Sequence, residues 1–189
     1  AQREQVLTSG ERTDLEKQLE AFLKIAPKSW RGWSALVSMR TADVARLRGA
    51  GQTQAASRRL ELLDKSIADM RAAAEPNDVL AQDAVASADL ERVLLDARTG
   101  NRMDRTKIDT VKLDAACAKA AEVALATGKG SAVRAVASRL VDAKGIDAGS
   151  KLLEDWLATH PADLITAGLD LEYVSRTGDP ENGFDRTQV

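Results

Sequence analysis

Histidine and cysteine, two residue types that enzymes often use for catalysis, each occur once in this 189-residue chain. Histidine is the usual general base near neutral pH, and the sequence has one, His160, directly before Pro161. A cationic side chain favours the C-terminal end of a helix dipole, so we interpret His160 as a helix-terminal residue. Cys117, the one cysteine, lies among alanines and leucine at helical spacing, which indicates a packing residue. A Ser-His-Asp or Cys-His catalytic set would therefore depend on His160 alone.

The other chemical patterns are weaker. Carboxylates recur at Glu154-Asp155 and at Asp64 and Asp69, but adjacent helical residues point apart and charged faces are usually solvated. Metal-ligand spacings do not occur, and a single cysteine excludes an internal disulfide or a cysteine cage within one chain. The stretch 127–131 (Thr-Gly-Lys-Gly-Ser) lacks the spacing of a phosphate-binding loop and follows a helix, so we interpret it as a glycine turn. We expect no catalytic residue, no metal site and no cofactor.

Composition and charge favour an all-α protein. Hydrophobic residues make up 44% of the chain and aromatic residues only 3%, and the net charge is −2. Alanine and leucine supply most of the apolar positions, and both favour helix over strand. A charge near zero argues against general nucleic-acid binding, which needs a basic surface. No apolar run approaches the roughly 18–20 residues of a membrane-spanning helix, so we expect neither nucleic acid as a partner nor a membrane span.

Hydrophobic residues spaced three and four apart, together with capping and stop signals, predict seven or eight helices. Thr13 and Glu16 form a capping-box pattern at the first, and Ser29 is the expected cap of the second. The predicted ranges are 13–26, 30–49, 53–75, 78–98, 106–126, 131–143, 147–159 and 163–176.

The breaks between these helices recur at long, similar intervals. Pro27, Pro76, the Thr127-Gly128 break and Pro161 are separated by 49, 51 and 34 residues. Each interval has room for a helical hairpin, and repeats of this length are typical of solenoids. We therefore divide the chain into approximate hairpins 29–76, 78–127 and 131–161, with a partial unit at each end.

The last interval resembles a tetratricopeptide repeat, a helix-turn-helix unit of 34 residues. With Pro161 as its closing proline, the buried positions fall on Val133, Val136, Ala137, Leu140, Gly149, Leu153 and Trp156. Residues 15–27 and 164–179 resemble single helices of further repeats, whereas the two middle hairpins are longer and lack the small-residue signature. The resemblance implies an α-α superhelix, a right-handed solenoid, over one domain, 1–189. We expect either a fragment of a longer chain or atypical terminal caps.

The resemblance also implies where such a module binds. In a superhelix of this type the first helices of successive pairs line a concave face, and their outward positions form a groove. This predicted concave face comprises Arg31, Ser34, Ser38, Asp83, Ser87, Arg134, Ser138, Glu172 and Arg176. It is mixed and polar, and it lacks the clamp of lysines, arginines and asparagines that a receptor for chaperone tails would carry.

A second candidate surface lies at the turns inside successive hairpins, which share one edge of a solenoid. Two of these turns are basic, and we call the set the basic edge: Arg46, Arg48, Arg58, Arg59, Arg98, Arg102, Arg105 and Lys107. It would suit an acidic partner or lipid headgroups, or it is a solvated loop. Among the tryptophans, Trp33 and Trp156 occupy expected core positions, and Trp30 is the better candidate for an exposed contact.

These observations favour a non-catalytic protein-interaction scaffold that binds a protein or peptide segment through its concave face or self-associates. The alternative is a helical accessory or substrate-recognition domain of a larger enzyme, secretion or envelope assembly, with the chemistry elsewhere. An independent enzyme is the third hypothesis, and loss of an activity in His160→Ala would support it.

Overall fold

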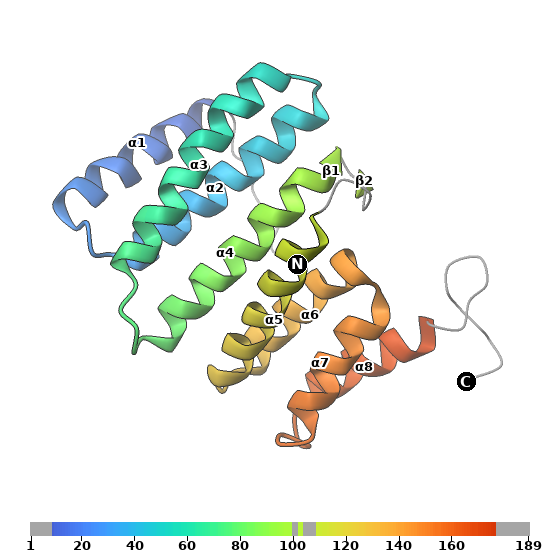
Figure 1. Ribbon diagram of the computed structural model, residues 1–189. Coiled ribbons are helices and arrows are strands. Elements are labelled where there is room, and N and C mark those ends of the chain that lie inside the picture. Colours follow the sequence, from blue (N-terminus) through green and yellow to red (C-terminus); the bar gives the residue numbers. More distant parts are fainter. Residues whose placement is uncertain (1–8, 100–101, 104–108, 177–189) are drawn as a thin grey trace. The chain divides into compact units, whose positions relative to one another are not determined.

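The computed structural model describes residues 9–99, 102–103 and 109–176, and it is built from helices (Figure 1). Within these ranges the eight helices are α1 (Ser9–Ile25), α2 (Trp30–Gly49), α3 (Thr53–Ala73), α4 (Val79–Ala97), α5 (Thr110–Ala126), α6 (Gly130–Lys144), α7 (Ile146–Leu157) and α8 (Leu164–Arg176). Two short strands, β1 (Arg98–Thr99) and β2 (Arg102–Met103), pair after α4. The prediction of an all-α chain is confirmed. The small β-ribbon was not predicted, because strands of two residues are too short to show an alternating pattern.

The helix ends lie within two residues of the predicted bounds except at the start of α5 and at the start of the first helix. This helix begins at Ser9, so Thr13 lies in its interior and the expected capping box with Glu16 does not form. Ser29 caps α2 as predicted, since its side chain accepts a hydrogen bond from the Gly32 N–H. Asp109 caps α5, and the predicted helix start at 106 lies outside the described residues.

Three of the turns between helices have the same local structure, and we call them the proline corners. A carbonyl accepts a hydrogen bond from the N–H three residues later in 26–29, 75–78 and 160–163, at 3.0, 3.1 and 3.1 Å. Proline follows that carbonyl each time, and its fixed φ suits this turn position. The turn's last residue, Ser29, Asp78 or Asp163, caps the N–H groups of the next helix. The periodic prolines therefore mark a repeated turn.

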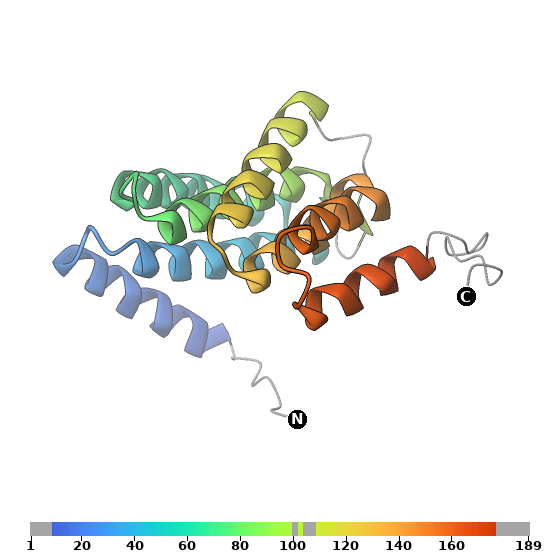
Figure 2. The ribbon, with the colours of Figure 1, turned by 90° about the horizontal axis from the view of Figure 1, so that it is seen from below.

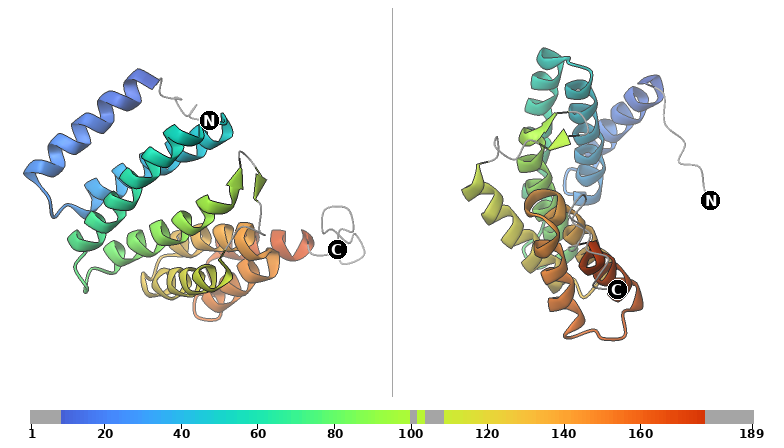
Figure 3. Two further views of the ribbon diagram at one scale, coloured as in Figure 1. Left: turned by 45° about the horizontal axis from the view of Figure 1, so that its top comes forward. Right: turned by 90° about the vertical axis from the view of Figure 1, so that its right-hand side faces the viewer.

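The chain divides into two compact units. Among the described residues, the first unit contains α1 to α3, α4 as far as Ala88, and β1. In this unit α2 lies between α1 and α3, as Figure 2 and the right-hand view of Figure 3 show. Leu36, Leu63 and Met70 are fully buried there. A Cβ on Gly32 would lie 2.9 Å from Leu23, so glycine allows α1 to approach α2 closely.

The second unit contains the rest of α4 and α5 to α8, and its most extensively packed helix pair is α6 with α7. A Cβ on Gly149 would overlap Val141 and lie 2.9 Å from the carbonyl oxygen of Ala137. The predicted burial of Trp156 and of the other apolar positions in this hairpin is confirmed. Cys117 is buried on α5, and burial raises the pKa of its thiol, as expected for a packing residue.

Candidate protein-binding surfaces

The structure exposes only part of the predicted concave face. On α2, Arg31 and Ser38 are exposed and Ser34 is half-buried, and the exposed residues Ala35 and Ala42 continue the same stripe. We call Arg31, Ala35, Ser38 and Ala42 the outer face of α2.

The remaining positions of this predicted face differ in exposure. Asp83 and Ser87 are half-buried on α4, whereas Ser138 on α6 and Glu172 on α8 are exposed. The side chain of Arg176 lies outside the described set.

Arg134, also predicted on the concave face, is held within the second unit. Its Nη1 donates hydrogen bonds to the Asp163 carboxylate, at 3.2 Å, and to the Thr166 hydroxyl, at 2.7 Å. Trp156 donates its indole N–H to the same carboxylate, at 3.0 Å. A Cβ on Gly130 would overlap this carboxylate, so the glycine leaves room for the Asp163 side chain where α6 begins. Arg134 therefore has a structural role at the third proline corner.

The bonds to Asp163 also change its acidity. Hydrogen bonds from the Thr166 side chain and backbone, supported by Trp156 and Arg134, lower the pKa of Asp163 to about 2. The carboxylate thus stays ionised, and able to cap α8, to lower pH than an ordinary aspartate. His160 stacks on Trp156 beside this cluster, with ring centroids 3.6 Å apart and 5° between the planes. This placement, just after α7 ends, agrees with a helix-terminal role for the histidine.

Asp78, which ends the second proline corner and caps α4, has a similar neighbour. Trp30 on α2 donates its indole N–H to the Asp78 carboxylate at 2.8 Å, and Arg31 lies over the Trp30 ring, 4.5 Å from its centroid. Trp30, expected to be an exposed contact, is therefore half-buried and used within the unit. The two units therefore share one kind of contact. A side chain near the start of α2 or α6 contacts the aspartate that caps α4 or α8, respectively.

The basic edge is partly neutralised by acidic side chains. Arg59 is bound to Glu16 and Asp43, and Arg46 lies 3.5 Å from Asp43. Arg58 is exposed, and Arg48 and Arg98 are half-buried. The side chain of Arg102, together with Arg105 and Lys107, lies outside the described residues. The half of this edge beside α2 and α3 therefore presents less positive charge than the sequence suggests.

Arg40 is a buried charge that sequence reasoning missed. Its guanidinium donates to Glu16 at 2.9 Å and to Glu20 on α1, and to the carbonyl of Leu62 and the hydroxyl of Ser66 on α3. Only 5% of the residue is exposed. Arg40 thus ties three helices together. The available signal was a charged residue four positions after Leu36 and four before Val44, on the apolar stripe of α2.

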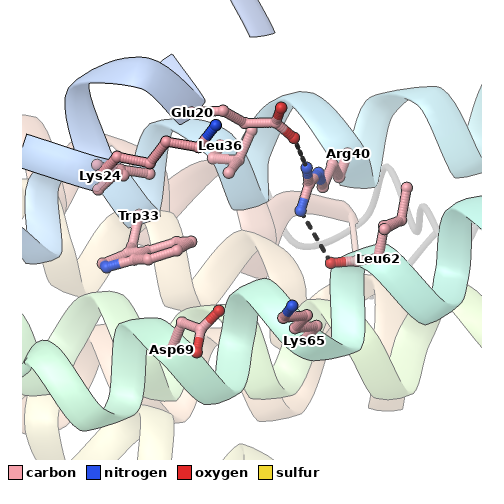
Figure 4. A pocket seen from close by; sticks show the side chains of 9 residues that line it. Glu20, Lys24, Trp33, Leu36, Arg40, Leu62, Lys65 and Asp69 are labelled. Atoms are coloured by element: carbon pink, nitrogen blue, oxygen red, sulfur yellow. Dashed lines mark hydrogen bonds and ion pairs between the residues drawn. The ribbon is translucent and has the colours of Figure 1, made fainter. Parts of the chain in front are cut away.

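A pocket of about 270 Å³ opens beside Arg40 (Figure 4). Its floor is α2, and its two walls are α1 and α3. The lining residues are Glu20, Leu23, Lys24, Trp33, Leu36, Arg40, Leu62, Lys65 and Asp69. Trp33, expected in the core, is instead half-buried on this floor, because its indole N–H reaches the Pro27 carbonyl at 2.8 Å. The lining combines apolar side chains with three basic and two acidic side chains.

Comparison with known proteins identifies no relative. No protein-family model, no curated protein and no solved structure matches the chain. In the part of the chain that the structure describes, no helix combines the length and apolarity needed to cross a membrane. Within the same described ranges, there is no group of three or more histidine, cysteine and carboxylate side chains that could hold a metal ion.

Proposed function

We propose that this chain is a non-catalytic module of stacked, tetratricopeptide-like helical hairpins that binds a segment of a partner protein. The observation that carries the proposal is the repeated contact at the proline corners. Trp30 at the start of α2 meets Asp78 before α4, and Arg134 in α6 meets Asp163 before α8. Contacts of this kind bring together the starts of alternate helices within each unit, as stacking of hairpins in a solenoid requires.

The outer face of α2 is the best-defined part of the proposed binding surface. Its residues stay exposed while the opposite side of the helix carries the buried Leu36, Val37 and Val44. Alternate helices of a solenoid present such faces side by side, and a partner segment lies across them. The titratable groups support binding over catalysis, because Cys117 is buried, His160 is stacked on Trp156 and Asp163 serves as a cap. The near-neutral charge favours protein over nucleic acid as partner.

A photo-crosslinking amino acid at Ser38 tests this proposal. We expect it to crosslink to a partner protein that mass spectrometry identifies, because Ser38 is exposed at the centre of the outer face. The matched control carries the same group at Lys17, an exposed position on α1. Crosslinking at Lys17 but not at Ser38 would contradict the proposed surface. We choose Ser38 over Arg134 because changing Arg134 would disturb the cap of α8.

The second candidate function, an accessory domain of a larger assembly, is favoured by the exposed apolar side of α8. Leu164, Ile165 and Leu171 are 81%, 70% and 70% exposed. Neighbouring apolar side chains on one helix often mark a surface that another element covers. Light scattering over a dilution series, compared with Leu171→Lys, separates the two ways of covering α8: a second copy of this chain would give self-association that Leu171→Lys abolishes, whereas a different partner leaves the isolated chain monomeric.

A further inference from the structure

The pocket between α1 and α3 lies on the side of α2 that faces away from its outer face. At about 100° per residue, Trp33, Leu36 and Arg40 point roughly half a turn away from Arg31 and Ser38. We propose that this pocket is a second binding site, which takes an amphipathic helix of a partner protein with charges of both signs beside its apolar face. This inference does not rest on the proposed function of the outer face.

The floor of the pocket suits one apolar anchor side chain. Leu23 and Leu36 are buried at its base, and Leu62 is 43% exposed on the wall formed by α3. Because the Trp33 N–H is already bonded to the Pro27 carbonyl, the indole offers an apolar surface without an unmet donor. Ligand sites for whole small molecules are usually larger, about 300–1,000 Å³, so the pocket fits a leucine- or phenylalanine-sized anchor.

Charges of opposite sign face one another across the mouth of the pocket (Figure 4). At the end beside Trp33, Lys24 on α1 faces Asp69 on α3. At the end beside Arg40, Glu20 on α1 faces Lys65 on α3. Each wall therefore carries one positive and one negative group a helical turn apart, and the order is reversed between the walls.

Three of these four groups are available to a ligand. Among the described residues, no ion pair or side-chain hydrogen bond engages Lys24, Lys65 or Asp69. Glu20 is bonded to Arg40 but remains 46% exposed. A helix lying between the walls would bring a lysine to each carboxylate and a glutamate to each ammonium, as in other helix-in-groove complexes. The four-charge pattern is unchanged when the bound helix is reversed, so either direction satisfies it.

Two synthetic peptides of identical composition provide the test. Both are helical, about 16 residues long, with a central leucine anchor and four charged residues beside it. The matched peptide places lysine against Glu20 and Asp69 and glutamate against Lys24 and Lys65, and the exchanged peptide swaps every lysine and glutamate. We expect the chain to bind the matched peptide about fivefold more tightly, because several exposed ion pairs each contribute little. The NMR signal of the Trp33 indole N–H, assigned with Trp33→Phe, should shift on binding.

A charge-swapped variant makes the test specific. In Lys24→Asp combined with Asp69→Lys, the charges at one end of the mouth are exchanged and those at the other end are not. The variant should therefore bind the two peptides with about equal affinity. The matched control swaps the exposed pair Asp14 and Lys17 on α1 and should keep the wild-type preference. Equal binding of the two peptides, an unchanged preference in the Lys24 and Asp69 variant, or no shift of the Trp33 signal at millimolar peptide would each overturn the proposal. Binding that Ala35→Lys abolishes would instead place the peptide on the outer face of α2.

Discussion

Replacing Arg40 by methionine should weaken the first unit strongly, because methionine matches the aliphatic part of arginine but lacks the guanidinium and cannot donate hydrogen bonds. The guanidinium makes four polar contacts, two with carboxylates of α1 and two with Leu62 and Ser66 of α3. Its side chain is only 6% exposed, so water cannot replace these contacts unless α1, α2 and α3 move apart.

The size of the effect follows from what the substitution leaves behind. Removing one partner of a buried ion pair costs about 3–5 kcal/mol of unfolding free energy. Glu20 is half-exposed and regains water, and Arg59 continues to bind Glu16, so the cost falls toward the lower end. We expect Arg40→Met to lower the unfolding free energy by about 3 kcal/mol, a large part of the roughly 5–15 kcal/mol typical of a domain.

Urea unfolding followed by circular dichroism measures this difference. The control is Lys24→Met, which also replaces a cationic side chain by methionine, at an exposed lysine one turn from Glu20, and should alter stability by less than about 0.5 kcal/mol. A double-mutant cycle with Glu20→Gln should give a coupling of about 1 kcal/mol. An unfolding free energy of Arg40→Met within about 1 kcal/mol of the wild-type value, with the same slope against urea concentration, would refute a structural role for this network.

The same network predicts a dependence on pH. Burial alone would raise the pKa of Glu16, but the hydrogen bonds from Arg59 and Arg40 outweigh it and lower the pKa below its ordinary value of 4.5. Stability from this carboxylate is therefore complete above pH 4.5 and is lost as the pH falls through the lower pKa of the folded state. The difference between wild type and Arg40→Met should shrink in the same acidic range.

Three further predictions use contacts in the second unit. Gly149→Ala should destabilise the protein by about 1–3 kcal/mol because of overlap with Val141. Gly168→Ala, where a Cβ meets open space, should stabilise it by roughly 0.5–1 kcal/mol, and thermal unfolding of the pair compares them directly. The Asp163 carboxylate should titrate near pH 2 by NMR. Its contribution to stability should be present above pH 3.8 and lost toward pH 2. Titration near pH 3.8 would show that its hydrogen bonds are absent in solution. Cys117 should react with a thiol reagent only after unfolding, and rapid reaction of the native protein would disprove its burial.

Features that depend on neighbours in the sequence were predictable. Helix positions followed from apolar spacing, the proline corners from recurrent prolines, and the burial of Cys117 and Trp156 from their places on apolar faces. These signals are local because helix periodicity and capping act over a few residues.

Features that join separate helices were not predictable in the same way. Arg59 was expected on a basic edge, but it binds Glu16, which lies 43 residues earlier. Arg134 was expected to face a groove and instead binds Asp163. The pocket is lined by charged side chains of α1 and α3, which face one another only because both helices pack on α2. Pairing of this kind depends on tertiary packing, which periodicity along one helix does not specify.

The proline corners also bear on how such a chain tolerates insertions. The hairpin of α2 and α3 has helices of 20 and 21 residues, whereas that of α6 and α7 has helices of 15 and 12 residues. The hairpin of α2 and α3 lies between two proline corners, and that of α6 and α7 ends at the third, so we place the difference in length at the opposite tips, at Gly51 and Gly145, where glycine adopts positive φ. Added turns at the tips would leave the cap contacts in register. Segments grafted at Gly51 or Gly145 should therefore lengthen a hairpin without disturbing the cap contacts of its own unit.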